Sequence, residues 1–238
     1  LKAKRGSLEP DLEWTREALA AHLDGLHLNW HPSTGRQVFS PDWQRVWGLD
    51  RARRADGAWY GPDSFGQLRT DLHARSLARA ARHLSPVPGD AVVDLYSGIG
   101  LSLERWKSAG ADFLGVELGA EAIACTALNL GEDGRVLRGR CSDRLPQIRE
   151  WSRRPRSGRV VVYANPPRTG LEPEVVAWLA SPDCEASMMA YLSCSPGTLA
   201  RDLRELGAAG WARAGFEAYD FFPGTHLVET LALLTRRG

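Results

Sequence analysis

Short apolar runs alternate with amphipathic stretches from residue 91 to the end of the chain. Strands that alternate with helical patterns are typical of a parallel sheet covered by helices. The expected strands are 91–95, 113–117, 135–137, 160–164, 188–192, 215–219 and 227–235. Helices are expected to begin near Gly100, Gly119, Asp143, Glu172 and Pro196, and a further helix at about 69–84 leads into the sheet. We therefore predict a doubly wound α/β fold with a mostly parallel, seven-stranded, Rossmann-like sheet over residues 61–238.

Residues 1–60 have a different pattern and form a small N-terminal appendage. A helix is expected near 12–23, followed by short tryptophan-bearing strands at 26–30, 37–39 and 46–48. We find no internal repeat. The expected domains are therefore 1–60 and 61–238.

Composition is that of a globular protein, with 43% hydrophobic and 25% charged residues among 238. Apolar stretches stay well short of the roughly 18 residues that span a bilayer, and no signal-type segment follows a basic start. The four cysteines, at positions 125, 141, 184 and 194, form no CxxC pair and no metal-ligand spacing. We expect a cytoplasmic protein without a metal and without a membrane partner.

Positive charge is concentrated between Arg135 and Arg159, although the net charge is only +1. This run holds nine arginines and two acidic residues, Asp143 and Glu150. It could contact nucleic-acid phosphates, because each neutralised phosphate releases counterions. The alternative is an ordinary solvated helix face and loop.

Residues 92–100 form an apolar strand that ends in Asp94 and a glycine turn with Gly98 and Gly100. Glycines at the carboxyl edge of a strand let the backbone approach a ligand. Leu103 stands where a dinucleotide site would have a third glycine, which disfavours NAD. Glu117 ends the next strand, where a carboxylate can accept hydrogen bonds from a ribose. This combination suits S-adenosylmethionine, the alternative being a tight turn without a ligand.

Two reactive side chains stand near the end of the sheet. Cys194 follows a strand and precedes Pro196, so the helix start is expected to lower the pKa of its thiol. Glu229 shares a strand face with Leu227, Leu231 and Leu233, and burial there is expected to raise its pKa toward neutrality. The structural alternatives are an inert core cysteine and an ion pair between Glu229 and Arg168.

Asn165 closes the strand at 160–164 and begins an Asn-Pro-Pro-Arg segment. Its amide offers both donors and an acceptor, so it could contact a base edge or a substrate amine. The alternative is a rigid turn capped by Asn.

Five segments, in order, resemble the RNA uracil-C5 methyltransferases that act on tRNA and ribosomal RNA, and the resemblance covers residues 61–238. They are Phe-Gly-Gln at 65–67, the loop at 94–100, Asn-Pro-Pro-Arg-Thr-Gly-Leu at 165–171, Ser-Cys-Ser-Pro at 193–196 and His-Leu-Val-Glu at 226–229. The resemblance implies Cys194 as nucleophile and Glu229 as base. It implies a cofactor pocket for S-adenosylmethionine lined by Gln67, Tyr96, Gly98, Glu117 and Asn165.

The chain departs from this family at several positions. Asn165 replaces an aspartate, Ser97 and Ser195 replace Cys and Asn, and Arg69 and Leu101 stand where Asn is usual. A Gly-Asp pair after the third strand is also missing. Residues 26–48 faintly resemble the family's central domain, but we see neither its RNA-binding barrel nor its iron–sulfur cysteines in these residues. RNA, tRNA or rRNA, is the expected partner, and a separate RNA-binding protein could present it.

Two other functions compete with uracil methylation. Asn-Pro-Pro followed by an aromatic residue is typical of enzymes that methylate amino groups, but Arg168 occupies the aromatic position. That interpretation also leaves Cys194 and Glu229 unused. A non-catalytic binding protein that kept the fold is the second, permitted by the changes at Asn165 and Leu101.

Overall fold

The computed structural model describes residues 2–3, 12–31, 40, 42–67, 69–131, 135–225 and 227–236. The chain divides into two compact units, Leu1–Ser64 and Phe65–Gly238. In the described residues no helix is long and apolar enough to cross a membrane.

The first unit holds a short helix and two small sheets. The helix predicted at 12–23 is α1 (Leu12–Leu19), which is shorter than expected. Strands β1 (Lys2–Ala3), β2 (Gly25–Trp30) and β3 (Trp43–Gly48) form one sheet, and β4 (Ala52–Arg53) pairs with β5 (Trp59–Tyr60). The strand predicted at 37–39 lies outside the described residues.

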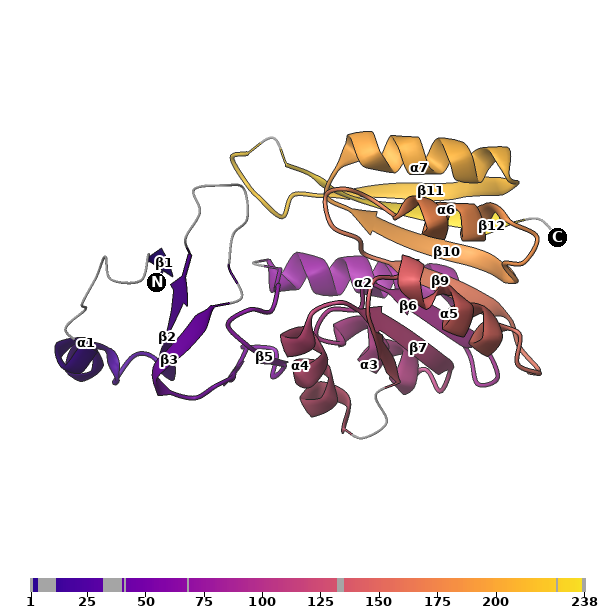
Figure 1. The fold of residues 1–238 in the computed structure, drawn as a ribbon. Helices are drawn as coiled ribbons and strands as arrows, with labels where there is room; N and C mark the ends of the chain where they lie inside the picture. The colour runs from indigo at the N-terminus through magenta and orange to yellow at the C-terminus, as the bar shows by residue number, and fades with distance from the viewer. Residues whose placement is uncertain are drawn as a thin grey trace. The chain divides into compact units, whose positions relative to one another are not determined.

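A seven-stranded sheet is the framework of the second unit as far as its described residues go (Figure 1). In chain order the strands are β6 (Ala91–Leu95), β7 (Asp112–Glu117), β8 (Val136–Arg138), β9 (Val160–Ala164), β10 (Ala186–Ser193), β11 (Trp211–Tyr219) and β12 (Glu229–Arg236). Their spatial order is β11-β12-β10-β9-β6-β7-β8. The strands from β10 to β8 are parallel, whereas β12 is antiparallel to both of its neighbours. The predicted fold is confirmed.

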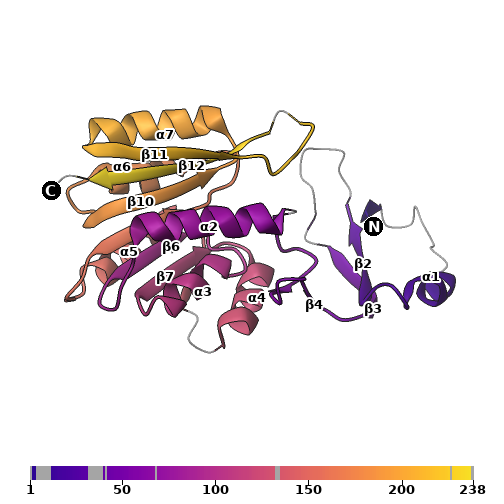
Figure 2. The same ribbon diagram turned by 180° about the vertical axis from the view of Figure 1, so that it is seen from behind.

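Helices cover both faces of this sheet (Figures 1 and 2). The helices are α2 (Thr70–Leu84), α3 (Leu101–Ser108), α4 (Ala120–Leu130), α5 (Leu145–Ser152), α6 (Pro173–Ala180) and α7 (Pro196–Ala208). A 3₁₀ turn, η2 (Ser142–Arg144), precedes α5. Buried residues of α2, α3 and α4 form one core with the sheet, and those of α5, α6 and α7 form the other. This two-sided cover explains why every residue of β6 and β9 is buried.

Strand β12 is shorter than predicted at its start. It begins at Glu229, so Leu227 precedes the strand instead of sharing its buried face. Leu231 and Leu233 do lie on that face, because both are buried in the core beneath α2. Glu229 therefore begins a strand whose next residues on the same side are apolar.

Candidate active site

Most of the predicted site residues lie at one edge of the sheet. The parallel strands end at this edge, and the antiparallel strand β12 begins there. Ligands of doubly wound folds bind outside the carboxyl ends of the strands. The residues that follow or end a strand at this edge are Tyr96, Gly98, Glu117, Asn165 and Cys194, and Glu229 starts β12.

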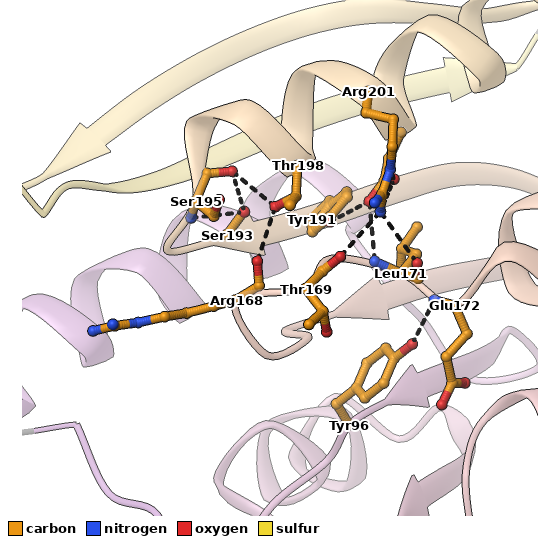
Figure 3. A network of polar contacts seen from close by, with 11 residues as sticks. Tyr96, Arg168, Thr169, Leu171, Glu172, Tyr191, Ser193, Ser195, Thr198 and Arg201 are labelled. Atoms are coloured by element: carbon orange, nitrogen blue, oxygen red, sulfur yellow. Dashed lines mark hydrogen bonds and ion pairs between the residues drawn. The ribbon is translucent and has the colours of Figure 1, made fainter. Parts of the chain in front are cut away.

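The loop between β6 and α3 is built from left-handed backbone conformations. Gly98 has φ 56° and Gly100 has φ 85°. A Cβ added to Gly98 would meet no atom within 4 Å, so the backbone here is open to a ligand. Tyr96 is also left-handed, with φ 62°, which is unfavourable for a residue with a side chain. Its hydroxyl accepts a hydrogen bond from the Glu172 backbone N–H at 3.4 Å (Figure 3).

Glu117 is fixed across the same loop by two backbone donors. Its Oε2 accepts from the Gly98 N–H at 2.9 Å, and its Oε1 accepts from the Gly119 N–H at 2.7 Å. Each carboxylate oxygen has a second lone-pair direction, so the group can still accept bonds from two neighbouring hydroxyls. This geometry fits the ribose contact that the sequence predicts for Glu117.

Asp94 does not join the ligand-facing residues, contrary to the role that the sequence suggested. Its carboxylate is fully buried in the core and accepts a hydrogen bond from Trp106 Nε1 at 2.6 Å. Burial raises the pKa of Asp94 to about 7. The side chain points inward because β6 alternates its faces, and Asp94 shares the α2-side face with Val92.

Cys194 and Glu229 are brought together by the register of β10 and β12. Ser193 pairs with Thr230 at the end of this antiparallel ladder, so Cys194 and Glu229 are the next residues along the two strand directions. Opposite residues of antiparallel strands project on the same face. Glu229 is only 2% exposed and Cys194 is half-buried. Glu229 therefore lies in the core, and Cys194 lies beside it at the accessible edge of the sheet.

Burial raises the pKa of Glu229 to about 7, as the sequence predicts. A hydrogen bond from Gln67 and the positive charge of Arg168 oppose this shift. Gln67, predicted to line the cofactor pocket, is thus a buried neighbour of the candidate base. Within the described residues, Glu229 and Arg168 do not approach to ion-pair distance. A carboxyl that titrates near neutrality can take up and release a proton at physiological pH.

The thiol of Cys194 differs from its sequence-based prediction. Its pKa is raised, because the side chain is half-buried and because the Glu229 carboxylate adds negative charge beside it. Arg168 opposes both effects. The expected lowering of the Cys194 pKa by the start of α7 is therefore wrong. Arg168 is the nearby cation that favours the thiolate.

Hydrogen bonds connect the segment after β9 to helix α7 (Figure 3). Asp202 is fully buried; it accepts bonds from the Leu171 N–H at 3.0 Å and from the Tyr191 hydroxyl at 2.7 Å. Arg201 donates to the Thr169 carbonyl at 3.0 Å. These contacts fix the backbone that carries Asn165 and Arg168 relative to the helix that follows Cys194.

Asn165 lies where β9 leaves the sheet beside β6. Its backbone N–H donates to the Leu95 carbonyl at 3.3 Å, and its side chain is half-exposed. The amide therefore stands between the glycine loop and the segment that carries Arg168. This position allows contact with a ligand at the strand edge.

The arginine run between 135 and 159 serves the protein's own structure in part. Ion pairs join Arg135 to Asp112, Arg153 to Asp183, Arg154 to Glu150 and Arg159 to Asp90. Arg156 lies over the ring of Trp151. Arg138 and Arg140, by contrast, are exposed where β8 ends, at the same edge as the glycine loop.

Tyr163 is a residue near this site that the sequence analysis missed. It is buried on β9, directly opposite Asp94 on β6. The only sequence signal was one hydroxyl within the apolar run 160–164. Among the described residues, no group of three or more His, Cys, Asp and Glu could hold a metal ion.

Comparison with known proteins agrees with this architecture. Residues 155–237, which carry Asn165, Cys194 and Glu229, match the tRNA (uracil-5-)-methyltransferase family. The family resemblance is thereby confirmed. The matched segment spans β9 to β12, the part of the sheet in which the candidate nucleophile and base meet.

Relatives extend the similarity over most of the chain. An uncharacterized RNA methyltransferase of Gloeobacter violaceus is 34% identical over 225 residues, covering 91% of this chain and 46% of that protein. Another, from Streptomyces avermitilis, is 35% identical over 191 residues, covering 76% of this chain and 42% of that protein. The chain thus spans about half the length of these relatives.

A solved structure shows the same fold. The Pyrococcus abyssi tRNA (uracil-54, C5)-methyltransferase, in complex with S-adenosyl-L-homocysteine, superposes with a TM-score of 0.66 at 24% identity. The similarity covers 90% of this chain and 50% of that one.

Proposed function

We propose that this chain methylates C5 of a uridine in RNA, tRNA or rRNA, with S-adenosylmethionine as the methyl donor. The observation that carries the proposal is the position of Cys194 beside Glu229 at the ligand edge of the sheet, one residue past the last pair of the β10–β12 ladder. A thiol and a buried carboxyl of raised pKa are the two groups that the reaction requires. The match of residues 155–237 to the tRNA (uracil-5-)-methyltransferase family supports it.

Uracil C5 is a poor nucleophile until a group adds to the ring. The Cys194 thiolate adds to C6, which breaks the C5–C6 double bond and makes C5 electron-rich. After C5 has gained its methyl group, the Glu229 carboxylate removes the remaining C5 proton. The C–H electron pair restores the double bond and expels the Cys194 thiolate. The raised pKa of Glu229 makes it a stronger base than an ordinary carboxylate.

The loop after β6 and the end of β7 suit S-adenosylmethionine. This cofactor supplies a methyl group activated by its sulfonium. Gly98 leaves open space for a ligand, and Glu117 holds both carboxylate oxygens where a ribose diol can bind. The structure of the Pyrococcus abyssi enzyme contains the demethylated form of the same cofactor. Tyr96, Gly98, Glu117 and Asn165 are the proposed pocket residues, with Gln67 between this pocket and Glu229.

A substrate base inside folded RNA must leave its stack to reach Cys194. Exposed Arg138 and Arg140 at the same edge could contact its phosphates, because such contacts are independent of sequence. We propose that a cytoplasmic RNA is the substrate and that no metal takes part. Methylation of an amino group is less well supported, because that reaction would use neither the Cys194 thiol nor the Glu229 carboxyl.

The test is incubation of the protein with radiolabelled S-adenosylmethionine and tRNA or rRNA that lacks C5 methylation. The RNA is then digested and the labelled nucleoside identified. We expect label in 5-methyluridine with the wild type and with C184A, which removes a buried thiol far from the edge. Label in an amino-methylated nucleoside, or no label although cofactor and RNA both bind, would overturn the proposal.

A further inference from the structure

Two side chains of helix α4 hold the backbone of the glycine loop between β6 and α3. Thr126 Oγ1 donates a hydrogen bond to the Gly98 carbonyl at 3.0 Å, and Asn129 Nδ2 donates to the Ile99 carbonyl at 2.8 Å. Residues three apart on a helix lie on the same face, so the two donors reach consecutive carbonyls of one loop. Thr126 and Asn129 thus form a clamp on the loop, the α4 clamp, although α4 contributes none of the proposed pocket residues.

The Thr126 hydroxyl is needed by the loop more than by its own helix. It also lies 3.0 Å from the Ala122 carbonyl, but a hydroxyl has only one proton to donate. In an α-helix the carbonyl of residue 122 already accepts the backbone N–H of residue 126. Among the described residues, Thr126 is the one donor to the Gly98 carbonyl. Because Thr126 is only 1% exposed, water has little access to this contact.

Gly98 is held on both sides of its Cα atom. Its N–H donates to Glu117 Oε2 at 2.9 Å, and its carbonyl accepts from Thr126. The two bonds fix the peptide groups before and after Gly98 and so fix its left-handed backbone, with φ 56°. Helix α4 packs tightly here, since a Cβ added to Gly100 would lie 2.8 Å from Thr126 Cγ2. The conformation of the loop is therefore set jointly by β7 and α4.

The α4 clamp also orients a backbone donor. The carbonyl and the N–H of a trans peptide point in opposite directions. Because the Gly98 carbonyl points toward Thr126, the N–H of the same peptide, that of Ile99, points away from α4. Among the described residues no acceptor is found for this N–H, although Ile99 is only 4% exposed. Buried backbone N–H groups are nearly always paired, so this donor is suited to a ligand at the strand edge.

We propose that Thr126 is a positioning residue for the cofactor: by holding the Gly98 carbonyl it presents the Ile99 N–H to S-adenosylmethionine. Asn129 holds the next carbonyl and keeps the following peptide in place. The role rests on the cofactor pocket of the proposed function. Thr126 acts through the loop, so it contributes to cofactor affinity and takes no part in methyl transfer.

The first measurement is the calorimetric affinity for S-adenosylhomocysteine. T126V keeps the shape of the side chain and removes the donor, so we expect affinity to fall about threefold to tenfold. T126S keeps the hydroxyl and should stay within about twofold of the wild type. The control is S76A, which removes a buried helical hydroxyl that donates to the His73 carbonyl of its own helix. An unchanged affinity in T126V, or an equal loss in S76A, would overturn the proposal.

The second measurement observes the loop itself by NMR. Residues 98–99 are the one Gly-Ile pair in the sequence, so carbonyl-¹³C glycine with ¹⁵N isoleucine selects this peptide alone. We expect its amide peak to move when S-adenosylhomocysteine is added to the wild type, because the Ile99 N–H gains an acceptor. Without ligand, T126V should move the Gly98 carbonyl resonance, whereas S76A should not. A peak that fails either test refutes the role of Thr126.

Methylation kinetics separate positioning from a merely structural role. T126V should raise KM for S-adenosylmethionine by the same factor as it lowers affinity, while kcat at saturating cofactor stays within about twofold. A fall in kcat with KM unchanged would contradict the proposal. If T126V does not fold, N129A replaces it, and an unchanged affinity in N129A would refute the α4 clamp. A wild type that binds S-adenosylhomocysteine but forms no 5-methyluridine would refute the proposed function, while affinity and NMR would still decide on Thr126.

Discussion

Cys194 and Glu229 stand one residue past the final backbone pair, Ser193 with Thr230, of the β10–β12 ladder. The separation of these two residues is therefore set by the register of β10 and β12. A slip of one residue would turn Glu229 to the opposite face of the sheet. Because β12 runs antiparallel to β10, its first residue, Glu229, lies beside Cys194, which follows the last residue of β10.

Replacing Cys194 by alanine should abolish 5-methyluridine formation, with a loss of at least about a thousandfold, because no other group is placed to add to C6. Affinity for S-adenosylhomocysteine should stay within about twofold, since the glycine loop lies on other strands. The measurement is labelled methyl transfer together with calorimetric cofactor binding. Activity that survives in C194A would favour an amino-directed methyltransferase.

Replacing Glu229 by glutamine should separate the two halves of the reaction. Addition of Cys194 and methylation at C5 need no base, whereas release needs removal of the C5 proton. The expected result is a covalent protein–RNA adduct, stable to denaturing electrophoresis and carrying the labelled methyl group. The double variant C194A/E229Q should form none. If E229Q turns over like the wild type, Glu229 is not the base.

The fold was predictable because its periodic signals are strong. Continuous apolar runs such as 91–95 and 160–164 match strands covered on both faces, and Pro196 marks the first residue of α7 as expected. Strand ends were less certain. Leu227 and Val228 continue the apolar pattern of β12, yet pairing begins only at Glu229.

The environment of the site was harder to predict than its residues. Burial of Glu229 followed from the apolar alternation along β12, but the effect on Cys194 depends on a carboxylate 35 positions away in the chain. The local sequence shows that Cys194 precedes the start of a helix, but it does not show that Glu229 lies beside the thiol. Tyr163 was missed for the same reason, because only the register of β6 and β9 shows that it faces Asp94.

The raised pKa of Glu229 makes stability depend on pH. The pKa rises from its ordinary 4.5 to about 7, so the folded chain binds this proton more tightly than the unfolded chain does. Stability from this group is present at low pH and is lost as pH rises from about 4.5 to about 7, by about 3 kcal/mol. E229Q should therefore be more stable than the wild type at pH 8.

Chemical denaturation at pH 5 and pH 8 checks the sign of this effect. The advantage of E229Q should grow with pH and be several-fold smaller at pH 5 than at pH 8, whereas E205Q, which changes an exposed glutamate on α7, should show no such trend. An E229Q advantage that is equal at both values would mean that the Glu229 pKa is not raised in the folded chain.

Substitution of Gly98 by alanine should weaken cofactor binding more than folding. The added Cβ meets no protein atom within 4 Å, so the fold bears only the left-handed backbone conformation, which costs about 1–2 kcal/mol. Gly210, with φ 90° and equally open surroundings, provides a matched control in the turn between α7 and β11. G98A and G210A should lose similar stability, but only G98A should lower affinity for S-adenosylhomocysteine, by about tenfold or more. Equal affinities in the two variants would place the cofactor away from this loop, because the backbone strain is common to both and only the position of the new methyl group differs.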